Sequence, residues 1–354
     1  MKKIKSMNKF TLTNIKSYGL VLIAFAILFP MQSSGLINNS ISGQLVPICT
    51  YIVMAISLTL TVGFLGELSL GHAGFMSVGA FSGVITAICL QGAIPVPCVR
   101  LLVAVIIGGI FAGIAGLIIG IPVLRLRGDY LAIVTLAFGE IIKNIINCVY
   151  VGVDKGGLHL SMKSADALNM ESGKLILNGP QGAVGIMKLS SFTSGVILIL
   201  FALFIVLNLV NSKTGRAVTA IRDNRIAAES VGISIARYKL TAFITSAVLA
   251  GMAGAMYAMN FSTIAAKKFD FNASILILVF VVLGGMSNIP GTIVATTLLY
   301  MLPELLREYA DYRMLLYAIV LIVVMLLTNS EKAKQMREVL VYKFKNLNQK
   351  RGEN

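Results

Sequence analysis

Ten runs of apolar residues follow one another along the chain, separated by short polar segments. A helix needs about 20 apolar residues to cross the hydrocarbon core of a bilayer, and most of these runs approach that length. The pattern therefore predicts an all-α, polytopic membrane protein with about ten transmembrane helices. The predicted spans cover residues 18–37, 44–65, 71–91, 99–121, 130–150, 191–211, 240–262, 272–288, 290–304 and 313–328.

The eighth and ninth runs are shorter than most of the others and are divided by Asn288, Pro290 and Gly291. They form either two short spans or one re-entrant pair. The first run follows five lysines, a pattern shared by secretory signal peptides. We expect an uncleaved first span instead, because the topology of the later spans is consistent only if the first one stays.

Basic residues are distributed unevenly among the polar segments. With the N-terminus inside, about twenty lysines and arginines fall on the inner side and nine on the outer side. This bias follows the positive-inside rule and, with an even number of spans, places both termini in the cytoplasm. We predict a multi-pass protein of the bacterial plasma membrane, surrounded by membrane lipid. Its parts are a basic cytoplasmic N-terminus (1–17), a transmembrane domain (18–328) with an external loop (151–190) and a cytoplasmic loop (212–239), and a basic cytoplasmic tail (329–354).

Composition narrows the classes of function. Hydrophobic residues make up 57% of the chain and charged residues 13%, about half the charged fraction of a soluble domain. The formal net charge is +15, but the basic residues lie between apolar runs, which argues against nucleic acid as a partner. Two histidines, and four cysteines without metal-ligand spacing, predict neither a metal site nor catalytic residues. The chain also lacks a Walker-type phosphate loop, so the energy for any ATP-driven process must come from a partner.

Four segments carry more specific patterns. They are residues 63–75, which begin Gly-Phe-Leu-Gly-Glu-Leu-Ser-Leu-Gly-His; 124–141, with Arg-Gly-Asp-Tyr at 127–130; 215–233, with Ala-Ala-Glu-Ser-Val-Gly at 227–232; and 282–291, which end Gly-Gly-Met-Ser-Asn-Ile-Pro-Gly. In this order and spacing, they resemble the permease subunits of branched-chain amino acid ABC importers. The resemblance spans about residues 45–328, and the first motif also occurs in related permeases for urea and short amides.

The resemblance implies the large permease architecture of ABC importers, with roughly ten helices per subunit. It also implies two ABC ATPase subunits, a second homologous permease or a second copy of this chain, and an extracytoplasmic solute-binding protein. The partner subunits would hydrolyse ATP, and this chain would need no cofactor. The solute would be a branched-chain amino acid, or urea, an amide or another small solute.

The third motif resembles the cytoplasmic helix through which ABC permeases receive the motion of their ATPases. We predict one helix from Thr219 to Val231 that stops at Gly232, because glycine commonly ends helices. The acidic residue that often precedes the two alanines in ABC importers is Ile226 here. The resemblance assigns ATPase coupling to Arg222, Asp223, Arg225, Ala227, Ala228, Glu229 and Gly232.

Polar residues within and beside the spans indicate a translocation path. The glycines near Glu67 and His72 favour close packing or a broken helix, whose ends present polar backbone groups to a zwitterionic solute. We expect His72 to be packed and hydrogen-bonded rather than a proton relay. Glu140 and Lys143 share a helical face and either line the path or neutralise each other. The candidates for the path are Glu67, Ser69, Gly71, His72, Thr135 and Glu140.

We expect structural roles for several charged residues at the edge of the fifth span and for small residues within two other spans. Asp129 lies at the predicted cytoplasmic edge with Arg125 and Arg127, where we expect a local ion pair or an N-cap that starts the span. Two stripes of small residues are typical of close helix packing. They are Gly113, Gly116 and Gly120, and Ala247, Gly251 and Gly254.

Two other classes of function stay open. An ion-coupled secondary transporter would need a buried acidic or histidine relay near the midplane, for which Glu140 is the candidate. A membrane-embedded enzyme would need His, Asp or Cys residues clustered at one depth, and the pattern shows no such cluster. Co-purification with ATPase subunits separates an ABC permease from a secondary transporter.

Overall fold

The computed structural model describes residues 9–35, 38–126, 128–154, 157–168, 170, 173–309 and 312–329. The predicted lysines Lys2, Lys3 and Lys5, Arg127, and nearly all of the predicted tail lie outside these residues. Each of the ten predicted runs forms a helix. They are α1 (Lys9–Ser33), α2 (Asn39–Leu58) with a π-helical continuation η2 (Thr59–Leu65), α3 (His72–Cys89), α4 (Pro97–Val123), α5 (Asp129–Asn147), α6 (Phe192–Asn211), α9 (Ile235–Ala258), α10 (Phe271–Gly284), α11 (Ile289–Leu305) and α12 (Arg313–Asn329).

Within the described residues, six helices are long and apolar enough to cross a membrane. These stretches are Asn14–Ser33, Asn39–Leu65, His72–Cys89, Pro97–Val123, Phe192–Asn211 and Ile235–Ala258. Helices α10 and α11 are apolar but shorter. Helix α1 begins at Lys9, inside the segment predicted to be a basic N-terminus. The chain is therefore a mostly helical, multi-pass membrane protein.

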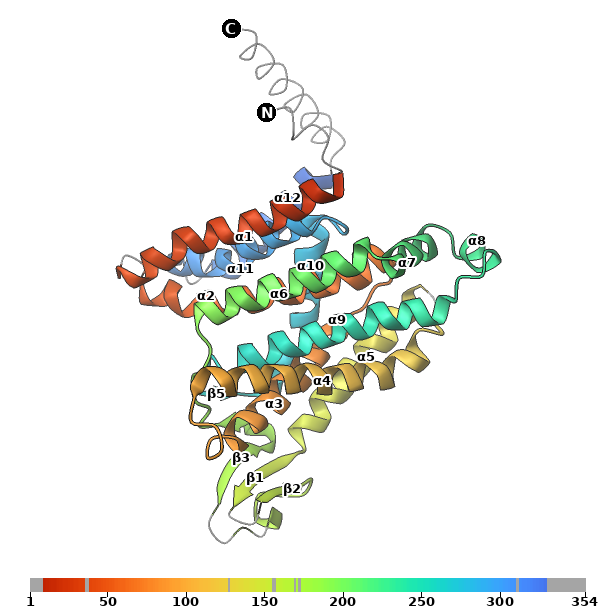
Figure 1. Ribbon diagram of the computed structural model, residues 1–354. Coiled ribbons are helices and arrows are strands. Elements are labelled where there is room, and N and C mark those ends of the chain that lie inside the picture. The colour runs from red at the N-terminus through yellow and green to blue at the C-terminus, as the bar shows by residue number, and fades with distance from the viewer. Residues whose placement is uncertain are drawn as a thin grey trace. The chain divides into compact units, whose positions relative to one another are not determined.

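The chain divides into two compact units, residues 1–297 and 298–354, and each is described by itself. The first contains α1 to α10 and the beginning of α11 (Figure 1). The second contains the end of α11, the 3-10 helix η6 (Leu306–Tyr309) and α12.

Helices α3, α4 and α9 pack against one another through glycines in the first unit. A Cβ atom on Gly254 of α9 would lie 1.9 Å from the carbonyl oxygen of Met76 in α3. On Gly116 of α4, a Cβ would lie 2.7 Å from the Cβ of Ala247 in α9. Only glycine allows backbones to approach this closely, as in other membrane helix pairs. The predicted packing role of both stripes is confirmed.

The second span lies in the interior of the first unit. All residues of its apolar window are buried, because α2 contacts α6, α9 and α10. Its last seven residues form the π-helix η2, which ends at Gly66 in the left-handed conformation (φ 76°). A π-helix is a rare, strained form that is frequent at functional sites.

The predicted external loop folds into part of a sheet, so the expectation of an all-α chain is wrong in this segment. The five antiparallel strands have the order β2-β1-β3-β4-β5. They are β1 (Tyr150–Asp154), β2 (Gly157–Ser161), β3 (Lys174–Asn178), β4 (Ala183–Val184) and β5 (Thr263–Ile264). Strand β5 comes from the turn after α9, about 80 residues beyond β4. A periodicity in the local sequence cannot reveal a sheet that is completed by such a distant strand.

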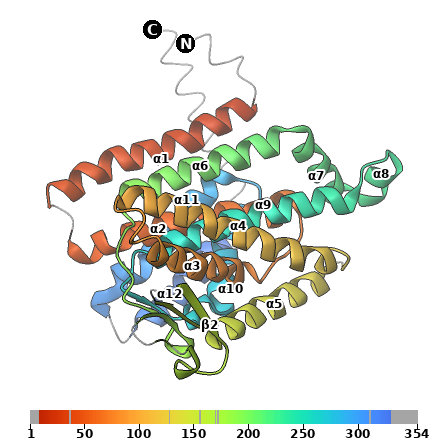
Figure 2. The same ribbon diagram turned by 60° about the horizontal axis from the view of Figure 1, so that its bottom comes forward.

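Two short helices, α7 (Lys213–Asp223) and α8 (Arg225–Ser230), precede α9, whereas β5 follows it. A helix of 24 residues is about 36 Å long, so α7 and α8 lie at the opposite end of α9 from the sheet. Figures 1 and 2 show α7 and α8 at the right and the sheet at the lower left. The predicted cytoplasmic loop, which holds α7 and α8, therefore lies at one end of α9. The predicted external loop, which holds most of the sheet, lies at the other end.

Candidate functional site

The predicted coupling segment consists of two helices, not one. The backbone of Asn224 is extended (φ −153°, ψ 105°), and its side chain accepts a 3.0 Å hydrogen bond from the backbone N–H of Ala227. Asparagine is among the strongest N-cap residues because its side-chain oxygen satisfies a free N–H at the start of a helix. The prediction of one helix from Thr219 to Val231 is therefore wrong at Asn224, whereas Gly232 ends α8 as expected (φ 82°).

Helix α8 turns one of its two alanines inward and the other outward. Ala228 is buried and packs with Ile221 of α7 and Ile235 of α9, while Ala227 is exposed. Two large apolar residues, Ile226 and Val231, are 82% and 75% exposed. The exposed face of α8 thus combines apolar side chains with Ala227, Glu229 and Gly232. Such exposed apolar side chains on a short helix are typical of a protein-docking surface.

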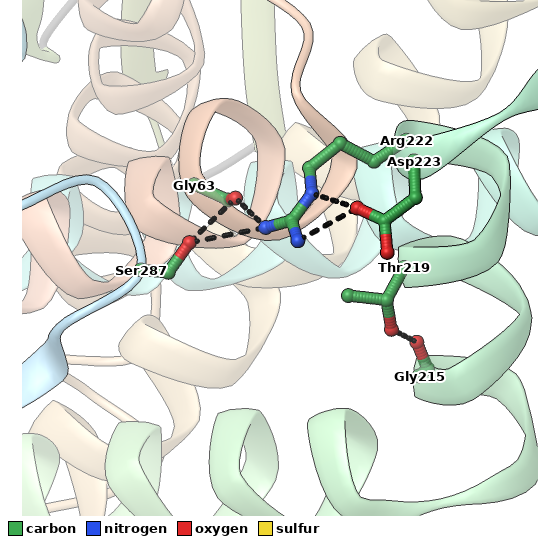
Figure 3. A network of polar contacts seen from close by, with 6 residues as sticks. All are labelled: Gly63, Gly215, Thr219, Arg222, Asp223 and Ser287. Atoms are coloured by element: carbon green, nitrogen blue, oxygen red, sulfur yellow. Dashed lines mark hydrogen bonds and ion pairs between the residues drawn. The ribbon is translucent and has the colours of Figure 1, made fainter.

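Figure 3 shows the side chain of Arg222, at the end of α7, directed toward Gly63 and Ser287. Its Nη1 donates to the backbone oxygen of Gly63 at 3.0 Å and to Oγ of Ser287 at 3.2 Å. Ser287 Oγ also donates to the Gly63 oxygen, at 2.9 Å. The Asp223 carboxylate accepts from Nε and Nη2 of Arg222 at 3.0 and 2.9 Å. Arg222 therefore connects α7, η2 and the α10–α11 turn.

Lys239 forms a second connection at the beginning of α9. Its ammonium donates to Glu67 Oε1 in an ion pair whose side chains are only 6% and 16% exposed. The other carboxylate oxygen of Glu67 and the hydroxyl of Ser69 are buried without a hydrogen-bond partner in the described chain. Burial makes an ion pair sensitive to the loss of either partner, because the remaining charge cannot reach water. Glu67 is thus held in a buried ion pair that joins the start of α9 to the segment after η2, and its place in a translocation path stays a prediction.

The other path candidates come together where α3 begins. His72 Nε2 lies 2.7 Å from Ser57 Oγ, and His72 is only 2% exposed, which confirms a packed, hydrogen-bonded histidine. Thr135 Oγ1 accepts from the backbone N–H of Leu70 at 3.0 Å. A Cβ on Gly71 would lie 2.1 Å from the Thr135 backbone oxygen. The predicted close packing therefore brings this loop directly onto α5.

This junction lies near the middle of the neighbouring helices. Ser57 accepts through its backbone oxygen from Ser246, the twelfth residue of the 24 in α9. The first turn of α10 meets the first turn of α3 here, because the Ala73 N–H donates to Ser274 Oγ at 3.1 Å. Helix α3 thus begins beside the middle of α9 rather than at one of its ends, an arrangement that agrees with the broken-helix alternative. Sequence reasoning did not include Ser274 among the path candidates. The sequence feature that points to it is its position in one of two short apolar runs separated by polar residues, proline and glycine.

Glu140 borders this junction and is paired with Lys143 of the same helix, as predicted. The two side chains are 33% and 18% exposed. Glu140 also lines a narrow crevice, without room for a water molecule, between the first turns of α3 and α10. The other lining residues are Leu70, Gly74, Leu136, Gly139, Phe269, Asp270, Phe271 and Ser274.

Asp129 is the first residue of α5, and Gly128 (φ 57°) occupies the N-cap position. The N-cap alternative for Asp129 is therefore wrong, although its charge still favours the positive end of the helix dipole. No ion pair joins Asp129 to Arg125 in the described residues. The third predicted residue of this edge, Arg127, lies outside them.

Comparison with known proteins identifies the family. The family described as "Branched-chain amino acid transport system / permease component" matches residues 40–327. The high-affinity branched-chain amino acid transport system permease protein LivM of Escherichia coli is 32% identical over 336 residues, which cover 88% of this chain and 73% of that protein. LivM of Salmonella typhimurium gives the same values.

A more distant relative is the L-arabinose ABC transporter permease protein AraH of Azospirillum brasilense, which is 28% identical over 273 residues. That match covers 76% of this chain and 71% of AraH. No solved structure is similar to this chain. The family match over most of the chain, together with the identity to LivM, shows that the chain belongs to the permease components of branched-chain amino acid transport systems.

Proposed function

We propose that this chain passes branched-chain amino acids inward across the bacterial plasma membrane, as one permease subunit of an ABC importer. The observation that carries the proposal is the 32% identity to a LivM protein over 88% of the chain. The relative named for L-arabinose transport is less similar and matches less of the chain, so a branched-chain amino acid is favoured over a sugar. The chain is a transport subunit rather than an enzyme, and ATP is hydrolysed by its partners.

All ten helices that match the predicted runs cross or enter the membrane in this proposal. The end that carries α7 and α8 faces the cytoplasm, because its segments hold most of the basic residues of the loops. Both termini then lie in the cytoplasm, and the sheet lies outside. Lipid surrounds exposed apolar faces such as that of α4, which carries Leu102, Ile110 and Ile118.

Two ABC ATPase subunits, a second homologous permease and a solute-binding protein complete the importer. The exposed face of α8 docks on one ATPase, since Ile226 and Val231 lack an intramolecular cover. At the opposite end, the edge strand β2 exposes Leu158 and Leu160, whose side chains point to the same face because they are two residues apart. Met162, just after the strand, is exposed as well. This apolar row is the proposed contact for the solute-binding protein.

The solute passes the junction where α3 and α10 begin. The N-terminus of α3 has no side-chain cap and its partial positive charge attracts a carboxylate, while the carboxylates of Glu140 and of Asp270, the N-cap of α10, favour an ammonium group. A zwitterionic amino acid presents both groups. The crevice at Glu140 is narrow, so an amino acid passes this point only when the crevice widens.

The test is ATP-dependent uptake of labelled leucine into proteoliposomes that contain the complete importer. We expect Ala227→Glu to abolish uptake, because it places charge on the exposed docking face, whereas Ala227→Ser keeps the residue small and retains uptake. Ala228 is unsuitable for this test, since its side chain is buried inside the chain. Uptake that needs no ATPase subunits and follows an ion gradient would show a secondary transporter instead.

A further inference from the structure

Arg222 holds together three segments that are far apart in the sequence. It lies 159 positions from Gly63 and 65 positions from Ser287, and these two lie 224 positions apart. All three contacts are within hydrogen-bonding distance, and Figure 3 shows two of them reaching the Arg222 guanidinium while the third joins Ser287 to Gly63. Arginine suits this arrangement, since its planar fork offers five donors in fixed directions.

The backbone around Arg222 leaves no space for other side chains. A Cβ on Gly63 would lie 1.4 Å from the backbone oxygen of Met286, and one on Gly66 would lie 2.6 Å from Cγ of Arg222. Gly66 also has a positive φ of 76°, which residues other than glycine rarely adopt. The end of the second span is therefore built to receive both the α10–α11 turn and the Arg222 side chain.

The Gly63 carbonyl is a suitable acceptor because it belongs to the last turn of η2. Carbonyl groups at the end of a helix lack intrahelical donors and carry the negative end of the helix dipole. A cation there satisfies both the hydrogen bond and the charge. Arg222 thus closes the end of a span that is buried throughout its apolar window.

The two elements that Arg222 holds both reach the junction at α3. The second span contributes Ser57, which contacts His72. Helix α10 contributes Ser274, which accepts from the Ala73 N–H, while the turn after its opposite end carries Ser287. Movement of Arg222 therefore acts on two helices whose far contacts border the proposed path.

We propose that Arg222 is a positioning residue that transmits movement of α7 and α8 to the second span and to α10, and so to the path. Ser287 and the Gly63 carbonyl are its receiving groups. Arg222 contacts neither ATPase nor solute in this role, which differs from the ATPase-facing role that sequence reasoning assigned to it. The inference rests on the proposed function, since it requires an ATPase that moves α8.

The test measures ATP hydrolysed per leucine transported in the complete reconstituted importer. Arg216 supplies a matched control, because it lies on the same helix but its guanidinium, within the described residues, donates only to the backbone oxygen of Asn211 at the end of α6. We expect Arg222→Gln to lower uptake about tenfold while hydrolysis stimulated by the loaded binding protein falls less than about twofold. Arg216→Gln removes the same charge and leaves the ratio of ATP to leucine unchanged.

Ser287→Ala provides a second variant that keeps Arg222 and its bond to Gly63. We expect it to raise the ratio of ATP to leucine about twofold, and it carries the test if Arg222→Gln fails to assemble with its partners. Equal ratios in wild type and Ser287→Ala, with Arg222→Gln unchanged or unassembled, would overturn the inference and leave the proposed function intact. A wild-type importer that takes up no leucine with ATP would instead overturn the proposed function.

Discussion

Lys239 and Glu67 lie 172 positions apart in the sequence and form a buried ion pair. The pair joins the beginning of α9 to the segment that follows η2. Arg222 of α7 reaches the end of η2 itself, through the Gly63 carbonyl. Side chains from α7 and α9 therefore bind the end of the second span and the residues after it at two points.

We expect Lys239→Met to destabilise the protein by about 3 kcal/mol, since it leaves the Glu67 carboxylate buried without its counter-charge. The double substitution Lys239→Met with Glu67→Leu removes both charges and regains most of the lost stability. Thermal unfolding in detergent measures this, with labelling of the buried Cys49 thiol as the signal once the exposed cysteines are replaced. Strictly additive losses in the double variant would show that the two side chains do not interact.

Gly254→Ala should destabilise the contact between α3 and α9 by about 1–3 kcal/mol, because its methyl group would collide with the Met76 backbone oxygen. Gly43→Ala is the matched control, since it lies in α2 with nothing within 4 Å of its Cβ. That substitution should be neutral or stabilise by about 0.5–1 kcal/mol, the usual gain when alanine replaces a helical glycine. The same thiol-labelling assay compares them, and equal effects would contradict the close packing.

Asn224→Ala should loosen α8 by about 1 kcal/mol, because it removes the side-chain oxygen that caps the Ala227 N–H. Asn224→Asp retains such an oxygen and serves as the control. Hydrogen exchange of the backbone amides at 225–230 measures the effect, with exchange expected to be about five times faster in the alanine variant. Unchanged exchange would mean that α8 is held by the burial of Ala228 alone.

Leu160→Asp should raise the concentration of loaded binding protein needed for half-maximal uptake about tenfold, because it puts charge into the apolar row on β2. His159→Asp adds the same charge on the neighbouring residue, whose side chain points to the other face of the strand. Basal ATP hydrolysis without binding protein should be unaffected in both. If the two variants behave alike, the row is not the contact.

Glu140→Gln should change the free energy of unfolding by less than about 0.5 kcal/mol, the usual value of an ion pair three residues apart on a helix. Leucine uptake should nevertheless fall, since the carboxylate borders the proposed path. If the Glu140→Gln variant transports normally, Glu140 has no role in the path and only forms an ion pair with Lys143. Loss of ion-gradient-driven uptake in the absence of ATPase subunits would support the secondary transporter instead.

Local sequence patterns were sufficient to predict the ten helices, because hydrophobic runs and glycine stripes depend only on residues that are close together in the sequence. Lys239–Glu67 and Arg222–Gly63 were not predictable as pairs. A signal was present for one of the pairs: Lys239 sits at the edge of a predicted span, and Glu67 lies in a glycine-rich loop assigned to the same side. Charges at span edges on one side of a membrane have few partners to choose from.

The contacts among the path candidates were predicted in part. Gly71 packs on Thr135, as the expected close packing requires, and the neighbouring His72 is hydrogen-bonded to Ser57. The ion pair of Glu67 with Lys239 and the contact of Ser274 with Ala73 were not predicted. The sheet was missed as well, because β5 lies far from the other strands in sequence. The break at Asn224 was locally visible, since asparagine favours caps over helix interiors. The alanines and Gly232 around it outweighed that signal.

The π-helix η2 sets a limit on how this segment can change during evolution. A π-turn holds one more residue than an α-turn, so deleting one residue between Thr59 and Leu65 would convert it into an ordinary helix. Every carbonyl beyond the deletion would then rotate by about 100° around the helix axis. The Gly63 oxygen would face away from both Arg222 and Ser287. Related chains should therefore keep the length of this turn and the glycine at Gly63, while the other residues of the turn vary in type.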